Sequence, residues 1–294
     1  MLILLTNDDG IAAPGLLALH AELSRLGEVY VVAPSSERSG VSHSLTYLTP
    51  LMVKEVYRDG QHGGWAVDGN PADCVKLGIT KICPRKPDLV VSGINNGLNA
   101  GVNILYSGTV AATVEAGFFN VDAVAVSMQN EKIIEYDKGA RIAVDLIQQI
   151  VAQNDDSPGP RLYNMNIPTR ALSRDNPEVH VVPMESENCH VDDYEQRHDP
   201  WGRQYYWIVG NMRDYSEHPP ETDLAVLARG QISLTPLQYD LTRYHALDRV
   251  RSWDLTAKAP GGNGDLPAEM STQEGVAYDA YDPSNDETTG EVTD

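Results

Sequence analysis

Residues 2–33 have the sequence LILLTNDDGIAAPGLLALHAELSRLGEVYVVA, and this stretch decides the class of fold. Its first part, Leu2 to Thr6, is a short apolar run of the kind found in strands that are buried on both faces. The leucines at positions 16, 19, 23 and 26 follow helical spacing. Val29 to Ala33 form a second apolar run. This strand–helix–strand order predicts a right-handed parallel crossover.

The alternation continues along the chain. Apolar runs at 88–92 and 123–127 predict two further buried strands, and the patterns at 109–119 and 134–151 predict helices. We therefore predict an α/β protein with a Rossmann-like, doubly wound and mostly parallel sheet. After about residue 155 the pattern changes to shorter strands between loops rich in Pro, Asp and Gly, which predicts an appended β-rich part with hairpins. The strands expected there are 162–167, 179–182, 205–209 and 231–235.

The composition limits the classes of protein to consider. The chain has 294 residues, 41% of them hydrophobic, but no run of about eighteen apolar residues, so we expect no membrane span. The first residues lack the basic stretch and cleavage site of a signal peptide, and we interpret them as a strand. The three cysteines, Cys74, Cys83 and Cys189, fit no zinc spacing. Reduced, buried thiols in a cytoplasmic protein are the simplest interpretation.

The formal net charge is −20, which argues against a nucleic-acid polymer as partner because phosphate backbones need basic surfaces. Residues 257–294 contain nine acidic residues and one lysine and have little hydrophobic content. This composition predicts a disordered acidic tail. We therefore divide the chain into a catalytic body at 1–256 and a tail at 257–294. The body itself divides into a Rossmann-like core at 1–155 and the β-rich part at 156–256.

The motif Asn7-Asp8-Asp9-Gly10 follows the first predicted strand. Ligands of open parallel sheets bind beyond the carboxyl ends of the strands. Adjacent carboxylates repel each other unless a cation neutralises them, and Gly10 allows a sharp turn. An ordinary polar turn, in which an aspartate caps the next helix, explains an isolated motif of this kind equally well.

Two more polar loops follow predicted strands. Residues 34–40, PSSERSG, place the Ser39 hydroxyl after the second strand, and residues 92–97, SGINNG, place the Asn95 amide after the strand at 88–92. Each loop alone is more simply a connection or an Asn-Gly turn. Because all three loops meet at one sheet edge, we expect a site of carboxylate, hydroxyl and amide oxygens. Such ligands suit Mg²⁺ or Mn²⁺ and not zinc.

A fourth motif, Tyr106-Ser107-Gly108-Thr109, lies just before the helix predicted at 109–119. Free backbone N–H groups at a helix start, with hydroxyls around them, can bind an anion. The alternative is an ordinary helix cap by Ser107 or Thr109. A cation site beside a phosphate cradle is what hydrolysis of a phosphate ester needs.

These motifs, in this order, closely resemble the SurE survival-protein family of nucleotidases. The resembling segments are LLTNDDGIAAPGLLAL, VVAPSSERSGVSHSLT, PDLVVSGINNGLNAGVNILYSGTVAATVEA, YNMNIP, DPWGRQYYWI and ISLTPLQYDLT. The resemblance implies metal ligands at Asp8, Asp9, Ser39 and Asn95, with the two aspartates as the catalytic pair. It implies phosphate-binding residues at Asn99, Ser107, Gly108 and Thr109.

The resemblance also implies an activity and an assembly. The expected reaction is hydrolysis of nucleoside 5′- and 3′-monophosphates by water activated by one Mg²⁺ or Mn²⁺, with short polyphosphate as a further substrate. The expected assembly is a homodimer or homotetramer that exchanges C-terminal elements. Three segments depart from the family pattern: Asn70 stands where a small residue is expected, 184–198 matches poorly, and the tail after about residue 257 has no counterpart.

Two rival interpretations remain. A phosphatase that forms a covalent aspartyl-phosphate on Asp8 usually spaces its acids as Asp-x-Asp, whereas Asp8 and Asp9 are adjacent. A non-catalytic, Mg²⁺-binding receiver module also carries an acidic pair after its first strand. It needs a phosphoacceptor aspartate after a later strand, where this chain has Ser92-Gly93-Ile94-Asn95.

Overall fold

The computed structural model describes residues 1–153, 158–186, 193–209 and 219–256. The chain divides into two compact units, Met1–Asp240 and Leu241–Asp294, and each is described by itself. The predicted tail at 257–294 lies outside the described residues. The borders that we place at 155 and 256 remain predictions.

The first unit is built around one nine-stranded sheet, in the order β3-β4-β2-β1-β5-β6-β7-β11-β8. The six strands from β4 to β7 are parallel, β3 is antiparallel to β4, and β11 is antiparallel to β7 but parallel to β8. The predicted α/β class with a mostly parallel sheet is confirmed. The strands are β1 (Leu2–Thr6), β2 (Glu28–Pro34), β3 (Val53–Arg58), β4 (Gln61–Val67), β5 (Leu89–Asn96), β6 (Asp122–Met128), β7 (Leu162–Ile167), β8 (Val179–Val181) and β11 (Ile232–Leu237).

Strand β1 is central, and its side chains show why the run is apolar throughout. Ile3 and Leu5 pack into one hydrophobic cluster, whereas Leu4 packs into another on the opposite face of the sheet. The chain leaves β1 towards β2 on one side and pairs with β5 on the other. The carboxyl end of β1 is therefore a topological switch point, where open α/β sheets bind their ligands.

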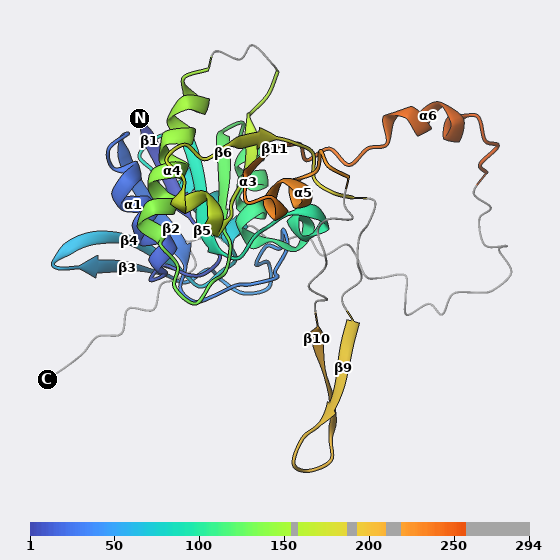
Figure 1. Ribbon diagram of the computed structural model, residues 1–294, viewed down its shortest axis with the longest axis horizontal. Helices are drawn as coiled ribbons and strands as arrows, with labels where there is room; N and C mark the ends of the chain where they lie inside the picture. Colours follow the sequence, from blue (N-terminus) through green and yellow to red (C-terminus); the bar gives the residue numbers. More distant parts are fainter. Residues whose placement is uncertain (154–157, 187–192, 210–218, 257–294) are drawn as a thin grey trace, which may run out of the picture. The chain divides into compact units, whose positions relative to one another are not determined.

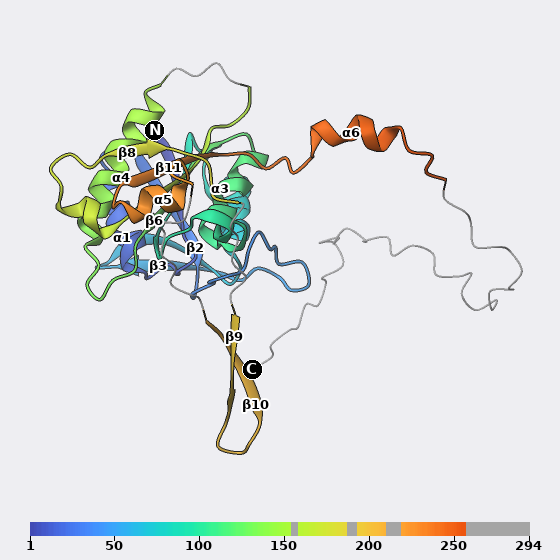
Figure 2. The same cartoon turned by 45° about the vertical axis from the view of Figure 1, so that its right-hand side comes forward.

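Helices cover both faces of this sheet (Figure 1). One face carries α1 (Pro14–Leu23) and α4 (Tyr136–Val151), which pack on the cluster that contains Ile3. The other face carries α2 (Pro71–Leu77) and α3 (Gly108–Phe118), and in Figure 2 α3 lies across the strands from α1 and α4. Shorter elements are α5 (Asp223–Ala228) and the helical turns η1 (Gly78–Ile82), η2 (Gly101–Tyr106) and η3 (Thr169–Ser173).

Two antiparallel hairpins complete the described strands. The β3–β4 hairpin extends the main sheet, and β9 (Asp193–His198) pairs with β10 (Gln204–Val209) in a separate two-stranded sheet. The hairpin expected in the β-rich part is thus confirmed. In the second unit, α6 (Tyr244–Arg251) buries none of its own residues. No helix within the described part of the chain is both long enough and apolar enough to cross a membrane.

Candidate active site at the switch point

The acidic pair lies in a tight turn directly after β1. The buried side chain of Asn7 holds this turn, because its Nδ2 donates to the Gly10 carbonyl (2.9 Å) and its Oδ1 accepts the Gly10 N–H (3.2 Å). Gly10 has a φ of +99°, a backbone conformation that residues other than glycine rarely adopt. The turn therefore has a fixed shape before any ligand arrives.

The Asp8 carboxylate is 4% exposed and faces the first turn of α3. The Thr109 hydroxyl donates to Asp8 Oδ1 (2.6 Å), and the Thr109 N–H donates to Oδ2 (3.2 Å). Gly108 allows this approach, because a Cβ there would lie 3.0 Å from Asp8 Cβ and 3.1 Å from Oδ2. The N-terminus of α3, which favours negative charge, thus orients the first carboxylate.

The electrostatics of the acidic pair disfavour its ionised form. Burial raises the pKa of Asp8 to about 6; the Thr109 hydrogen bond opposes this shift, and the charge of Asp9 adds to it. The pKa of Asp9 is also raised, mainly by burial and further by the charge of Glu37, against a hydrogen bond from the Asn96 N–H. A bound cation would relieve both penalties.

The loops after β2 and β5 reach the acidic turn through backbone hydrogen bonds. The Arg38 N–H donates to the Asp8 carbonyl (2.7 Å), which places Ser39 one residue from this contact. The Asn96 N–H donates to Asp9 Oδ2 (3.1 Å), which places Asn95 beside the second carboxylate. The four residues predicted as metal ligands thus come from segments that the structure brings together.

The side chains of Ser39 and Asn95 make local contacts. Ser39 Oγ donates to Glu37 Oε1 (2.7 Å), and Asn95 Nδ2 donates to the Gly97 carbonyl (2.8 Å). Asn95 was expected in a loop but lies within β5, which continues past an irregularity in its pairing with β6. Gly93 permits this, because it has a φ of +138° and a Cβ there would lie 2.2 Å from the Val126 carbonyl oxygen.

Of the predicted phosphate-binding residues, those at the start of α3 lie beside this turn. Ser107 is the N-cap of α3, since its Oγ accepts the Val110 N–H (3.2 Å). Thr109 contacts Asp8 with both of its polar groups. Asn99 is 8% exposed, and its side chain donates to Ser127 Oγ (2.8 Å). The ordinary capping role considered for Ser107 is therefore present in the structure.

Two contacts anchor the residues that follow Ser39, and neither was predicted from the sequence. His43 Nε2 lies 2.7 Å from Oε2 of the buried Glu115, and Thr46 Oγ1 donates to Asp73 Oδ2 (2.7 Å). Glu115 stands in a helix of small and apolar residues, and that isolated charge was the available clue. Arg38, in the same loop, forms an ion pair with Asp68 (2.8 Å).

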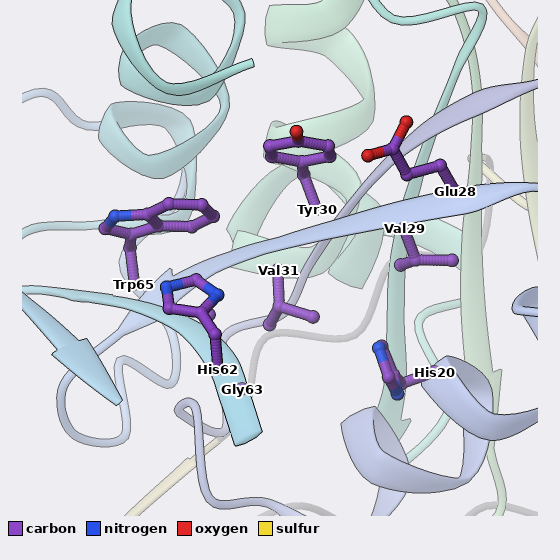
Figure 3. A pocket seen from close by; sticks show the side chains of 9 residues that line it. His20, Glu28, Val29, Tyr30, Val31, His62, Gly63 and Trp65 are labelled. Carbon is purple, nitrogen blue, oxygen red and sulfur yellow. The ribbon is translucent and has the colours of Figure 1, made fainter. Parts of the chain in front are cut away.

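A hollow of about 210 Å³ lies elsewhere, along the first half of β2 (Figure 3). His20, Glu28 and His62 line it, together with the stacked rings of Tyr30 and Trp65, whose centroids are 5.8 Å apart. The loop that brings Ser39 to the candidate site follows the last residue of β2. The candidate site and the hollow therefore lie at opposite ends of this strand. The hollow also lacks a carboxylate pair, so we assign the chemistry to the acidic turn.

The donors at the acidic turn fit a hard divalent cation. They comprise two carboxylates, a hydroxyl and an amide, all oxygen ligands of the kind that Mg²⁺ and Mn²⁺ prefer. Across the ranges that the structure describes, no group of three or more His, Cys, Asp or Glu side chains is placed to hold a metal ion. A cation here would therefore need the neutral oxygens of Ser39 and Asn95 to complete its shell.

Comparisons with known proteins identify the family that the chain resembles. The family model described as survival protein SurE matches residues 3–190. A protein of Rhodopirellula baltica named 5′-nucleotidase SurE is 51% identical over 257 residues, which cover 87% of this chain and 99% of that protein. A protein of the same name from Desulforudis audaxviator is 41% identical over 261 residues, 88% of this chain and 99% of the relative.

A solved structure leads to the same family. The crystal structure of the SurE protein from Aquifex aeolicus matches with a TM-score of 0.73 and 34% identity, covering 85% of this chain and 98% of that one. The family model covers the acidic turn and the six parallel strands of the sheet that carries it. This chain belongs to the SurE survival-protein family.

Proposed function

We propose that the protein is a divalent-metal-dependent phosphomonoesterase that hydrolyses nucleoside 5′-monophosphates to nucleoside and phosphate. The observation that carries this proposal is the buried Asp8 carboxylate, held by Thr109 at the start of α3 beside a second carboxylate. The names of the relatives support the substrate class. We extend the proposal to 3′-monophosphates and short polyphosphate, which present the same phosphoryl group.

We assign the metal ligands as Asp8, Asp9, Ser39 and Asn95. When bound, a Mg²⁺ or Mn²⁺ ion would supply Lewis acidity, which polarises a phosphate ester and lowers the pKa of water. The protein's own contribution is to hold the two carboxylates in place with hydrogen bonds that favour their ionised form. Thr109 does so for Asp8, and the Asn96 N–H does so for Asp9.

We assign the phosphoryl oxygens to Asn99 and to the segment from Ser107 to Thr109. The Ser107 hydroxyl can cap α3 as an acceptor and still donate its proton to an oxygen of the substrate. The Gly108 N–H lies at the positive end of the α3 dipole and can face the phosphoryl group, whereas the Thr109 N–H donates to Asp8. Because Thr109 already contacts Asp8, it links the phosphate cradle to the metal ligand.

We favour direct attack by water over a covalent aspartyl-phosphate on Asp8. Both oxygens of Asp8 accept hydrogen bonds from Thr109, which restrains the carboxylate from reaching a phosphorus atom. Direct attack is a single in-line displacement, so a chiral phosphate ester should be hydrolysed with inversion of configuration. Retention, or a trapped acyl-phosphate on Asp8, would favour the covalent route.

The test of the function is phosphate release from a panel of nucleoside monophosphates in the presence of Mg²⁺, Mn²⁺ or EDTA. We expect activity with either metal and none in EDTA. Asp8→Asn and Asp9→Asn should each lower kcat/KM by about 10³-fold or more, a loss typical of removing an essential catalytic group. The matched control is Asp88→Asn, which should remain active. It changes a carboxylate at the other end of β5, where Asp88 accepts the Leu2 N–H. Full activity in EDTA would refute the proposed site.

We also propose that the protein is a cytoplasmic homodimer or homotetramer that exchanges C-terminal elements. The described part of the second unit supports this, because Leu241, Trp253 and Leu255 are at least half exposed in the single chain. Large apolar side chains exposed together often mark an interface.

A further inference from the structure

We propose that Ser127, Asn164 and Asn166 form a bracket that positions Asn99 for phosphate binding. The inference rests on the proposed function, because it takes Asn99 as a ligand of the phosphoryl group. None of the three residues is itself assigned to the metal or to the substrate. They are positioning residues, and they act through Asn99.

The first part of the bracket holds the backbone of Asn99. The side-chain amide of Asn166 pairs with this backbone in both directions, since its Oδ1 accepts the Asn99 N–H (2.8 Å) and its Nδ2 donates to the Asn99 carbonyl (3.0 Å). Asn164 Nδ2 donates to the same carbonyl (2.7 Å). The Asn99 peptide groups are therefore fixed by three hydrogen bonds from β7.

The second part of the bracket holds the side chain. Asn99 Nδ2 donates one of its two N–H groups to Ser127 Oγ (2.8 Å). This hydrogen bond restrains rotation of the Asn99 side chain while its Nδ2 faces Ser127. The second N–H then has a defined direction, and we assign it to an oxygen of the phosphoryl group.

The burial of the bracket supports a purpose beyond packing. Ser127, Asn164 and Asn166 are all fully buried on the adjacent strands β6 and β7, and Ser127 is the register partner of Asn166. Burying an amide is costly unless its hydrogen bonds are made, and an apolar side chain would fill the same space without that cost. Here the polar groups converge on one residue, Asn99, which lies three positions after Asn96, whose N–H donates to Asp9.

Two hydroxyls on the neighbouring strand β11 provide matched controls. Ser233 and Thr235 are the register partners of Asn166 and Asn164, and both are buried. Within the described residues, neither hydroxyl has a hydrogen-bond partner. Ser233→Ala and Thr235→Val therefore remove buried polar atoms at the same depth without touching Asn99.

The experiment measures the inhibition constant (Ki) of inorganic phosphate, KM and kcat with a nucleoside 5′-monophosphate and Mn²⁺ on the full-length chain. We expect Ser127→Ala to raise Ki and KM about tenfold, which corresponds to the loss of one hydrogen bond to an oriented amide. Asn166→Ala should raise them about 100-fold, because Asn99 then loses its backbone anchor. The two control variants should keep wild-type Ki values, and thermal melts would verify that each variant is folded.

A double-mutant cycle separates positioning from a general structural effect. In an Asn99→Ala background, Ser127→Ala should cause no further rise in Ki, because the side chain that it orients is gone. Wild-type Ki values for Ser127→Ala and Asn166→Ala, with Asn99→Ala clearly weakened, would overturn the bracket and leave the proposed function standing. An unchanged Ki for Asn99→Ala would instead contradict the phosphate-binding role of Asn99, and the bracket with it.

Discussion

In the metal-free protein, the burial of Asp8 opposes the ionisation that metal binding requires. Asp8 is buried, which penalises its ionised form, and it must be ionised to bind a cation. The folded chain binds a proton at Asp8 up to about pH 6, whereas an unfolded chain releases it near its ordinary pKa of 3.8. The native state is therefore destabilised progressively as the pH rises from about 4 to about 6, and the penalty is complete above pH 6.

Asp8→Asn should consequently stabilise the metal-free protein while it removes activity. In EDTA above pH 6 we expect the free energy of unfolding to rise by about 1–3 kcal/mol relative to wild type, and below pH 4 we expect no difference. Urea unfolding of both proteins at several pH values measures this. A variant that is less stable than wild type at pH 7.5 in EDTA would contradict the destabilisation that we assign to the buried Asp8 carboxylate.

Gly108 and Gly117 lie in the same helix and separate activity from stability. A Cβ at Gly108 would crowd Asp8, whereas one at Gly117 would lie 2.8 Å from Leu162 Cδ1, in the hydrophobic core. We expect Gly108→Ala to lower kcat/KM by about 10- to 100-fold with a small change in melting temperature. Gly117→Ala should lower the melting temperature and leave kcat/KM close to wild type. Equal losses of activity in both variants would mean that the effect is general to the helix.

Some features of the candidate site could be predicted from the sequence, and others could not. The acidic pair follows an apolar strand, and the rule for parallel sheets places its carboxylates at a ligand-binding edge. The partners of Asn99 could not be found in this way, because Asn164 and Asn166 lie more than sixty residues away along the chain. In the sequence they only alternate with apolar residues, as in any half-buried strand.

At the scale of elements, the strands β1, β2, β5, β6 and β7 and the helices α1, α3 and α4 were predicted from their apolar patterns. The hairpin of β3 and β4 was not predicted, because its charged edge strand, VKEVYR, lacks an apolar run. Its Asp59-Gly60 turn was the available clue. Helix α2 was missed because it has only seven residues, although the Asn70-Pro71 start and its capping box mark a helix N-terminus.

Asp223 connects elements that the sequence pattern leaves unrelated. Its buried carboxylate accepts the N–H groups of Gly101 (2.8 Å), Glu185 (2.9 Å) and Leu224 (2.8 Å), and so ties α5 to η2. We expect Asp223→Ala to lower stability by about 2–4 kcal/mol, because two buried N–H groups and one partly buried N–H group lose their acceptor. Thermal melts measure the loss, with Asp248→Ala on the exposed helix α6 as the control. A melting temperature within about 1 °C of wild type would contradict this role.

At the scale of the whole molecule, the two parts of the C-terminal unit, residues 241–256 and 257–294, differ in composition. The described part of the unit is rich in exposed apolar side chains: Leu241 is 90% exposed and Leu255 is 72% exposed, while α6 buries no residue of its own. Residues 257–294 instead carry nine acidic residues and one lysine. An interface needs apolar area, and a strongly acidic segment repels its own copies. We therefore place the assembly contacts before residue 257.

Two truncations test this division. A chain that ends at Thr256 should keep the wild-type oligomer and the wild-type kcat and KM, because it retains every apolar side chain of the described part of the unit. A chain that ends at Asp240 should dissociate to monomers, because it loses Leu241, Trp253 and Leu255 together. Light scattering over a range of protein concentrations distinguishes the two outcomes, with phosphate release measured on the same samples. If the Thr256 chain dissociates while retaining its melting temperature, the acidic segment contributes to the interface, and the repulsion argued from its charge is outweighed by contacts that its composition does not predict.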